Sequence, residues 1–155
     1  MTDKLNELRR KHPKIIREYE EALLYSAAQV QFNAPDMIGK YLLSQGLADH
    51  PQENFWVLNL DTKLQLQSLT KLYKGTVNQA VLRHAEVFRM AIIQNCPHMI
   101  IAHNHPSGDV QPSSDDIQTT RILVESGKSL DIDVIDHIIV GNGKWFSLRE
   151  RGLMH

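Results

Sequence analysis

The chain has 155 residues, 42% hydrophobic and 23% charged, which suits one globular domain with a sizeable core. Its 17 lysines and arginines nearly balance 18 aspartates and glutamates, so no global charge favours nucleic acid or an anionic membrane. Cys96 is the single cysteine, which excludes an intrachain disulfide and a thiolate-rich metal cluster. No apolar run approaches the roughly 20 residues that span a bilayer, and the N-terminus lacks a signal peptide's apolar stretch. These features predict a cytoplasmic protein without a membrane segment.

The N-terminal part of the chain is predicted to be helical. Residues 2–28 carry apolar side chains near helical spacing, with an interruption at Pro13. Six lysines and arginines lie between Lys4 and Arg17, but the glutamates among them favour a solvated helix face over a basic arm for nucleic acid. Residues 33–36 predict a turn and residues 34–47 a short helix. We predict an N-terminal helical segment over residues 1–25 and one domain over residues 26–155.

From residue 55 onward, strand and helix patterns alternate. Two strands of a hairpin are predicted over residues 55–61 and 64–73, followed by a turn at residues 74–76. The later pattern predicts a helix over 85–95, a buried strand over 98–103, a helix over about 114–127, a buried strand over 132–141 and a hairpin at 141–148 that leads to an edge strand. Strands interleaved with helices indicate a layered α/β domain.

The segment from His103 to Asp116 combines residues that suit a catalytic metal site. Side chains two positions apart on a strand point to the same side, so His103 and His105 at a strand end can converge on one point. Pro106 ends the strand, Gly108 permits a sharp turn, and the chain returns as a helix whose first turn holds Asp116. Two imidazoles and one carboxylate match the three protein ligands of a catalytic zinc, whereas a structural zinc normally has four.

A purely structural interpretation also explains these residues. Ser113 as N-cap with Asp116 at position N3 would form an acidic variant of the capping box, and Asp115 suits the positive end of the helix dipole. A lone His-x-His pair is more often a surface or core feature than a metal site. The joint spacing of the histidines, the serine and the aspartate therefore favours a functional site, while no single residue does.

This spacing resembles a known family. His-x-His, seven residues, serine, two residues and aspartate form the H-x-H-x7-S-x2-D motif of the JAMM (MPN-plus) metallopeptidases. The stretches "FWVLNLDTKLQL", "KGTVNQAVLRHAEVFRMAI", "MIIAHNHPSGD" and "DVIDHIIVGNGKWFSLRERGL" are similar to the bacterial RadC-like subgroup, in the same order over residues 26–155. The resemblance implies an α/β fold of the JAMM/MPN-like (cytidine-deaminase-like) type, a mixed β-sheet packed between helices.

The resemblance also implies a role for each motif residue. His103, His105 and Asp116 would hold Zn²⁺, and the Ser113 hydroxyl would assist the oxyanion. The family carries an upstream glutamate that hydrogen-bonds the metal water, and Glu86 is the matching position. Position alone would explain Glu86 equally well, because a glutamate in the first turn of a helix is favoured by the helix dipole.

The chain departs from its relatives in two places. The loop "DVQPS" stands where many relatives have Pro-Thr-Pro-Ser, although Pro112 and Ser113 are kept. Longer relatives begin with a helix-hairpin-helix DNA-binding module that the first residues here do not resemble. The family's DNA-repair label and a nucleic-acid partner are therefore weakly supported. His137 recurs in the family pattern. It could lie next to the metal ligands, or it could be a histidine buried in the core.

The first hypothesis is a zinc metallopeptidase of JAMM type, in which a metal-activated water attacks an amide or isopeptide bond of an unidentified protein or peptide. The alternative is a metal-binding JAMM-fold interaction module without catalysis, linked to DNA repair or mobile-element biology. An HNH nuclease would leave the spacing to Ser113 and Asp116 unexplained. A metallo-β-lactamase-like H-x-H-x-D-H site would require an aspartate where Ser107 stands.

Overall fold

The computed structural model describes residues 2–26, 29–75 and 81–154. In chain order its elements are α1 (Thr2–Lys11), α2 (Pro13–Leu23), α3 (Pro35–Ser44), the 3-10 helix η2 (Leu47–Asp49), β1 (Asn54–Leu60), β2 (Leu66–Lys74), α4 (His84–Gln94), β3 (His98–Asn104), α5 (Ser114–Ser129), β4 (Asp133–Gly141) and β5 (Lys144–Ser147). Two predictions, the last residues of the first helical stretch (27–28) and the end of the turn at 74–76, lie outside the described residues.

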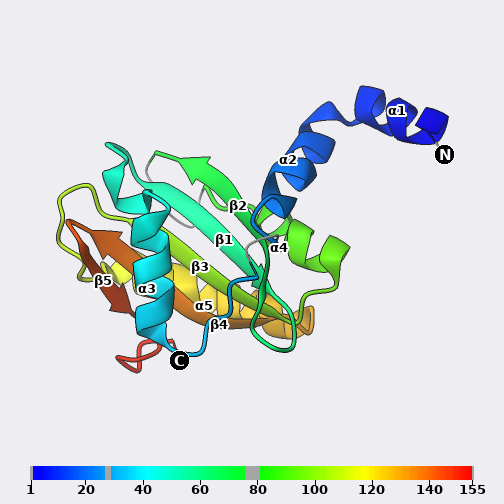
Figure 1. Ribbon diagram of the computed structural model, residues 1–155. Helices are drawn as coiled ribbons and strands as arrows, with labels where there is room; N and C mark the ends of the chain where they lie inside the picture. The colour runs from blue at the N-terminus through cyan, green and yellow to red at the C-terminus, as the bar shows by residue number, and fades with distance from the viewer. Residues whose placement is uncertain (1, 27–28, 76–80, 155) are drawn as a thin grey trace.

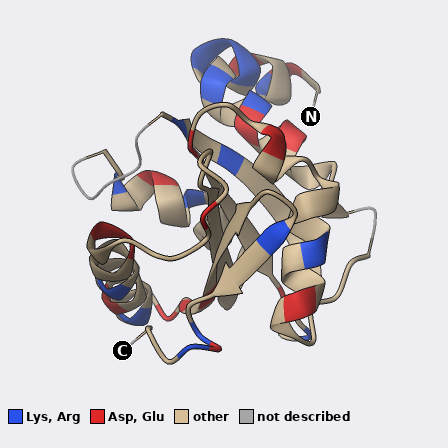
Figure 2. Ribbon diagram, turned by 90° about the vertical axis from the view of Figure 1, so that its left-hand side faces the viewer, with Lys and Arg blue, Asp and Glu red and all other residues tan. Residues whose placement is uncertain are grey.

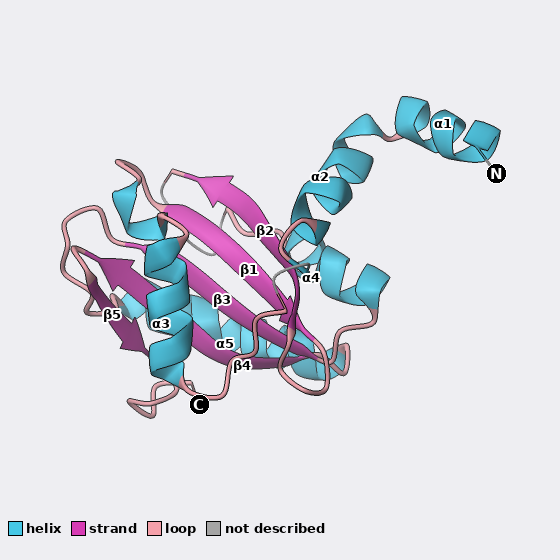
Figure 3. Ribbon diagram, viewed as in Figure 1, coloured by secondary structure: helices cyan, strands magenta, loops and turns pink. Residues whose placement is uncertain are grey.

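The described strands form a five-stranded mixed sheet in the order β2-β1-β3-β4-β5 (Figure 3). β3 and β4 are parallel because α5 crosses between them, and the other neighbouring strands are antiparallel. α3 covers one face of the sheet, whereas α4 and α5 cover the other (Figure 1). This arrangement confirms the predicted α/β fold, with a mixed sheet packed between helices.

Alternating side chains of the central strands build a core on each face of the sheet. On β3, Ile100 packs toward α3, whereas Met99 and Ile101 pack beneath α4 and α5. All three are fully buried, and each contributes on the order of 1.5–3 kcal/mol to folding. The same alternation directs His103, at the end of β3, to the face covered by α5.

A bulge in β4 decides which side chains face α5. The register between β3 and β4 shifts by one residue and leaves Ile135 without an opposite residue. In a regular strand, residues three positions apart face opposite sides. Because the bulge reverses the alternation, Val134 packs beneath α4 and α5 while His137 contacts Thr120 of α5 from the same face. A regular β4 would turn His137 toward α3.

The first two helices form an arm that extends beyond the sheet (Figures 1 and 2). α1 and α2 are joined by an ion pair of Arg9 with Glu20 at 2.7 Å, and α2 is joined to α4 by Glu18 and Arg89 at 2.9 Å. Basic and acidic side chains thus pair within the arm. Among the helices of the described ranges, none has the length and apolar character needed to cross a bilayer. The boundary near residue 25 stays a prediction.

Candidate metal centre

His103 and His105 bring their rings together where β3 ends. The Nε2 atoms of the two imidazoles are 3.0 Å apart. The amide of His105 donates to the carbonyl of Val140 at 2.9 Å, which extends the pairing with β4 by one residue. Both side chains therefore project from the same face of an extended backbone.

The loop that follows β3 orients the His105 ring. The Asp109 carbonyl oxygen lies 2.7 Å from His105 Nδ1, and because a carbonyl can only accept, this nitrogen carries a proton. Gly108 makes the required turn with φ +87°, and a Cβ at this position would lie 3.0 Å from Cβ of Asn142. The turn thus leaves Nε2 of His105 facing His103.

The first turn of α5 adds the carboxylate of Asp116. Its Oδ2 lies 3.1 Å from His105 Nε2, and its Oδ1 lies 3.3 Å from His103 Nε2. The Ser113 hydroxyl accepts the Asp116 amide at 3.0 Å, and the Ser113 amide donates to Asp116 Oδ2 at 2.8 Å. The predicted capping box is therefore present. It holds the same carboxylate toward the imidazoles, so the structural and functional interpretations of Asp116 are compatible.

Besides Asp116, the carboxylate of Glu53, which was not predicted from the sequence, approaches the histidine pair. One carboxylate oxygen of Glu53 and one ring nitrogen each of His103 and His105 lie within 4.8 Å of one another. Glu86 begins α4 on the side of β2, where its Oε2 accepts the Tyr73 hydroxyl at 2.6 Å. That hydrogen bond lowers the pKa of Glu86. Glu86 thus has Tyr73 as a partner, and the role that the resemblance implies for it stays a prediction.

Glu53 reaches the histidines because β1 and β3 are antiparallel. The start of β1 then lies beside the end of β3, with Phe55 opposite His103. The family resemblance placed the upstream glutamate at position 86, and strand periodicity did not predict this pairing of β1 with β3. The available signal was weak: Glu53 is the acid that immediately precedes the first strong strand pattern.

Asn104, between the two histidines, ties the segment that carries Glu53 to the end of β3. Its Oδ1 accepts the amide of Asn54 at 2.6 Å, and its Nδ2 donates to the carbonyls of His50 at 3.2 Å and Gln52 at 3.0 Å. The Asn104 side chain is fully buried. Three hydrogen bonds to one buried amide therefore fix the path of residues 50–54 beside the histidine pair.

The charges of the site depend on each other. Burial raises the pKa of the Asp116 carboxyl, but hydrogen bonds from His103 and His105 outweigh burial and hold this pKa far below its ordinary value. The hydrogen bond to Asp116 raises the pKa of His105. A proton and a metal ion thus compete for the same ring nitrogen of His105.

His137 lies in the core and also contacts a candidate ligand. Its side chain is 1% exposed, and its Nε2 lies 2.7 Å from Nδ1 of His103. Burial lowers the pKa of His137 well below the ordinary value of 6.5, so its ring is neutral. His137 is therefore both a buried core residue and a neighbour of the candidate ligand His103.

The donor set suits a divalent metal ion. Two imidazole nitrogens and one carboxylate converge, and Nδ1 of His105 is already engaged by a carbonyl, which leaves its Nε2 for an ion. His105 is the more open of the two histidines, with 16% of its side chain exposed against 2% for His103. Cys96 packs in the core beneath α4 and offers no ligand here.

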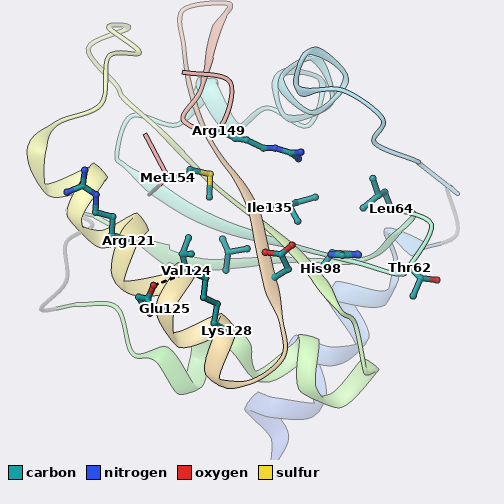
Figure 4. Close-up of a pocket in the computed structure, with 12 residues that line it drawn as sticks. Thr62, Leu64, His98, Arg121, Val124, Glu125, Lys128, Ile135, Arg149 and Met154 are labelled. Carbon is teal, nitrogen blue, oxygen red and sulfur yellow. Dashed lines mark hydrogen bonds and ion pairs between the residues drawn. The ribbon is translucent and has the colours of Figure 1, made fainter. Parts of the chain in front are cut away.

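One pocket among the described residues lies away from this centre. It has a volume of about 980 Å³, and Figure 4 shows Arg121 and Lys128 of α5 on one side of it and Arg149 on the other. His98, which begins β3, lines this pocket, whereas His103 lies near the other end of the same strand. No candidate metal ligand is among its lining residues.

Comparisons with known proteins agree with the motif. Residues 32–153 match the model of the RadC-like JAB domain. UPF0758 proteins of Chloroflexus aurantiacus and Roseiflexus castenholzii are 42% and 40% identical over 142 and 141 residues, and that of Clostridium perfringens is 37% identical over 136 residues. These matches cover 90%, 90% and 88% of this chain and 62%, 60% and 60% of the relatives. The chain thus spans about three fifths of their length, and the predicted family resemblance is confirmed.

Proposed function

Because this chain belongs to the RadC-like JAB domain family, we propose that it is a zinc-dependent hydrolase that cleaves an amide or isopeptide bond in a protein or peptide. One observation carries the proposal: two imidazole nitrogens 3.0 Å apart converge with a carboxylate that lies 3.1 and 3.3 Å from them. Three protein ligands are the number found in catalytic zinc sites, which keep a position for water or substrate.

Each residue of the site has a distinct task in this proposal. His103, His105 and Asp116 would hold the ion, which would supply Lewis-acid chemistry by lowering the pKa of a water and polarising the substrate carbonyl. Glu53 acts as the general base and returns the proton to the leaving amine. The Ser113 hydroxyl accepts from the Asp116 amide, so its own proton is available for the developing oxyanion.

Metal content tests the proposal first. We expect about one zinc per wild-type chain by elemental mass spectrometry, and little in a His103→Ala/His105→Ala double variant or in Asp116→Ala. Asp115→Ala is the matched control, because Asp115 is the exposed neighbour of Asp116 on the same helical turn. A wild-type protein that retains no zinc, after zinc is offered and the excess removed, would overturn the proposal.

Hydrolysis is tested with the zinc-loaded protein. Peptide libraries and isopeptide-linked peptides are incubated with the wild type and with Asp116→Ala, and products are read by mass spectrometry. Cleavage that requires Asp116 supports the hydrolase. A protein that binds zinc and cleaves none of these substrates would favour the metal-binding interaction module instead.

A further inference from the structure

A chain of three hydrogen bonds runs from one candidate ligand to the backbone of another. His103 Nδ1 lies 2.7 Å from His137 Nε2, His137 Nδ1 lies 2.6 Å from Thr120 Oγ1, and Thr120 Oγ1 lies 2.6 Å from the Asp116 carbonyl oxygen. The three residues whose side chains form it, His103, His137 and Thr120, are each at most 1% exposed. This series of hydrogen bonds thus connects the end of β3 to the first turns of α5 through β4, inside the core.

The last acceptor sets the direction of every bond in this chain. A carbonyl oxygen can only accept, so the single hydroxyl proton of Thr120 is donated to Asp116, four residues earlier on the helix. Thr120 Oγ1 must then accept from His137, which places a proton on Nδ1 of that ring. The His137 ring is fully buried, and among the described residues its ring nitrogens face only Thr120 and His103, so with its one proton on Nδ1 its Nε2 has a lone pair and accepts from Nδ1 of His103. In the neutral His103 ring, Nε2 then carries the lone pair and faces His105 and Asp116, whereas a proton on Nε2 belongs to the charged ring that hydrogen-bonds Asp116.

We propose that His137 and Thr120 are positioning residues that fix the tautomer of His103, so that its Nε2 is free of a proton and directed at the metal. This inference rests on the proposed metal site. His105 obtains the same tautomer from the Asp109 carbonyl. The more exposed ligand is therefore oriented by a loop carbonyl, and the buried ligand by a side-chain relay.

Thr120 matters because the two rings have a second arrangement open to them. Without the hydroxyl, His137 can carry its proton on Nε2 and donate to Nδ1 of His103. The proton of His103 then moves to its Nε2, which lies 3.3 Å from Asp116 Oδ1. This alternative satisfies the hydrogen bond between the rings equally well, but it places a proton where the metal would bind.

The tautomer is measured in the metal-free protein by long-range ¹H–¹⁵N NMR of the histidine rings, at about pH 8, above the ordinary pKa of histidine. We expect His103 to be protonated on Nδ1 in the wild type and on Nε2 in Thr120→Val. Thr119→Val is the control, because Thr119 is buried next to Thr120 and its side chain forms no hydrogen bond among the described residues. Protonation of His103 on Nδ1 in Thr120→Val, or on Nε2 in the wild type, would overturn the inference.

Zinc affinity gives a second readout, by competition with a chromophoric chelator. We expect Thr120→Val and His137→Leu to bind zinc about 10–100-fold more weakly than the wild type. His137→Gln should recover most of the affinity, because its Oε1 can accept from His103 Nδ1. Wild-type affinity in both Thr120→Val and His137→Leu would overturn the inference, and the valine and glutamine variants decide the matter if His137→Leu does not fold.

The two experiments separate this inference from the function on which it rests. If the wild type binds no zinc, the proposed function fails, while the NMR experiment independently supports or overturns the tautomer of His103. If the wild type binds zinc and the relay variants bind it equally well, the metal site stands and the positioning role fails.

Discussion

Ser113 and Asp116 hold each other by two reciprocal hydrogen bonds, from the Ser113 amide to Asp116 Oδ2 at 2.8 Å and from the Asp116 amide to Ser113 Oγ at 3.0 Å. The carboxylate that completes this cap is also the one that faces both candidate histidine ligands. One local motif therefore begins α5 and aims a metal ligand, so its two functions can be separated only by substitution.

Ser113→Ala tests the contribution of the cap to stability. The Asp116 amide loses its acceptor, and we expect the free energy of unfolding of the metal-free protein to fall by about 1 kcal/mol. Urea denaturation followed by circular dichroism measures this change. Ser114→Ala is the control, because Ser114 is the exposed first residue of α5 and does not form the cap. Equal stability of the two variants would contradict the prediction.

Glu53→Gln and Glu86→Gln test which glutamate transfers the proton. We expect Glu53→Gln to retain zinc and to lose about 10²–10⁴-fold in the rate of hydrolysis, because glutamine cannot act as a base. Glu86→Gln should hydrolyse at the wild-type rate, because the Glu86 carboxylate is engaged by the Tyr73 hydroxyl. The comparison uses any substrate found with the zinc-loaded wild type. The reverse order of rates would restore Glu86 as the general base.

Asn104→Ala tests the hydrogen bonds by which Asn104 holds the segment that carries Glu53. The variant removes three hydrogen bonds from a fully buried side chain and leaves the carbonyls of residues 50 and 52 without this donor. We expect a loss of about 2–4 kcal/mol in the free energy of unfolding. Faster hydrogen exchange at the Asn54 amide should accompany it. Gln118→Ala removes an exposed side-chain amide on α5 and should leave both quantities unchanged. A wild-type rate of hydrogen exchange at the Asn54 amide in Asn104→Ala would contradict the prediction.

Cys96 provides a prediction for pH. Burial raises the pKa of its thiol from 9.0 to about 11, so the fold favours the neutral form. The resulting stabilisation is complete below pH 9.0 and is lost as the pH rises through about 11. At about pH 8.5, alkylation by iodoacetamide should be on the order of 100-fold slower in the native protein than in urea, because the thiolate is the reactive species. Equal rates in the two states would show that the native thiol is exposed.

The sequence alone indicated those features of the site that depend on residues close in the chain. The capping box joins Ser113 to Asp116 within one helical turn, and the two histidines share a face because they lie two positions apart on extended backbone. The alternation of strand and helix patterns likewise predicted a layered α/β domain. Hydrophobic periodicity and capping are local properties, so a single sequence carries them.

Only the tertiary structure decided which distant residues join the histidines. Glu53 reaches them because β1 pairs antiparallel with β3, a choice that strand periodicity does not specify. His137 faces His103 because β4 contains one residue more than its pairing with β3 requires, which reverses the alternation of its side chains. Register and strand order arise from contacts between segments dozens of residues apart. The grouping of His103, His105 and Asp116 could therefore be predicted from the sequence, whereas the approach of Glu53 and the contact of His137 with His103 could not.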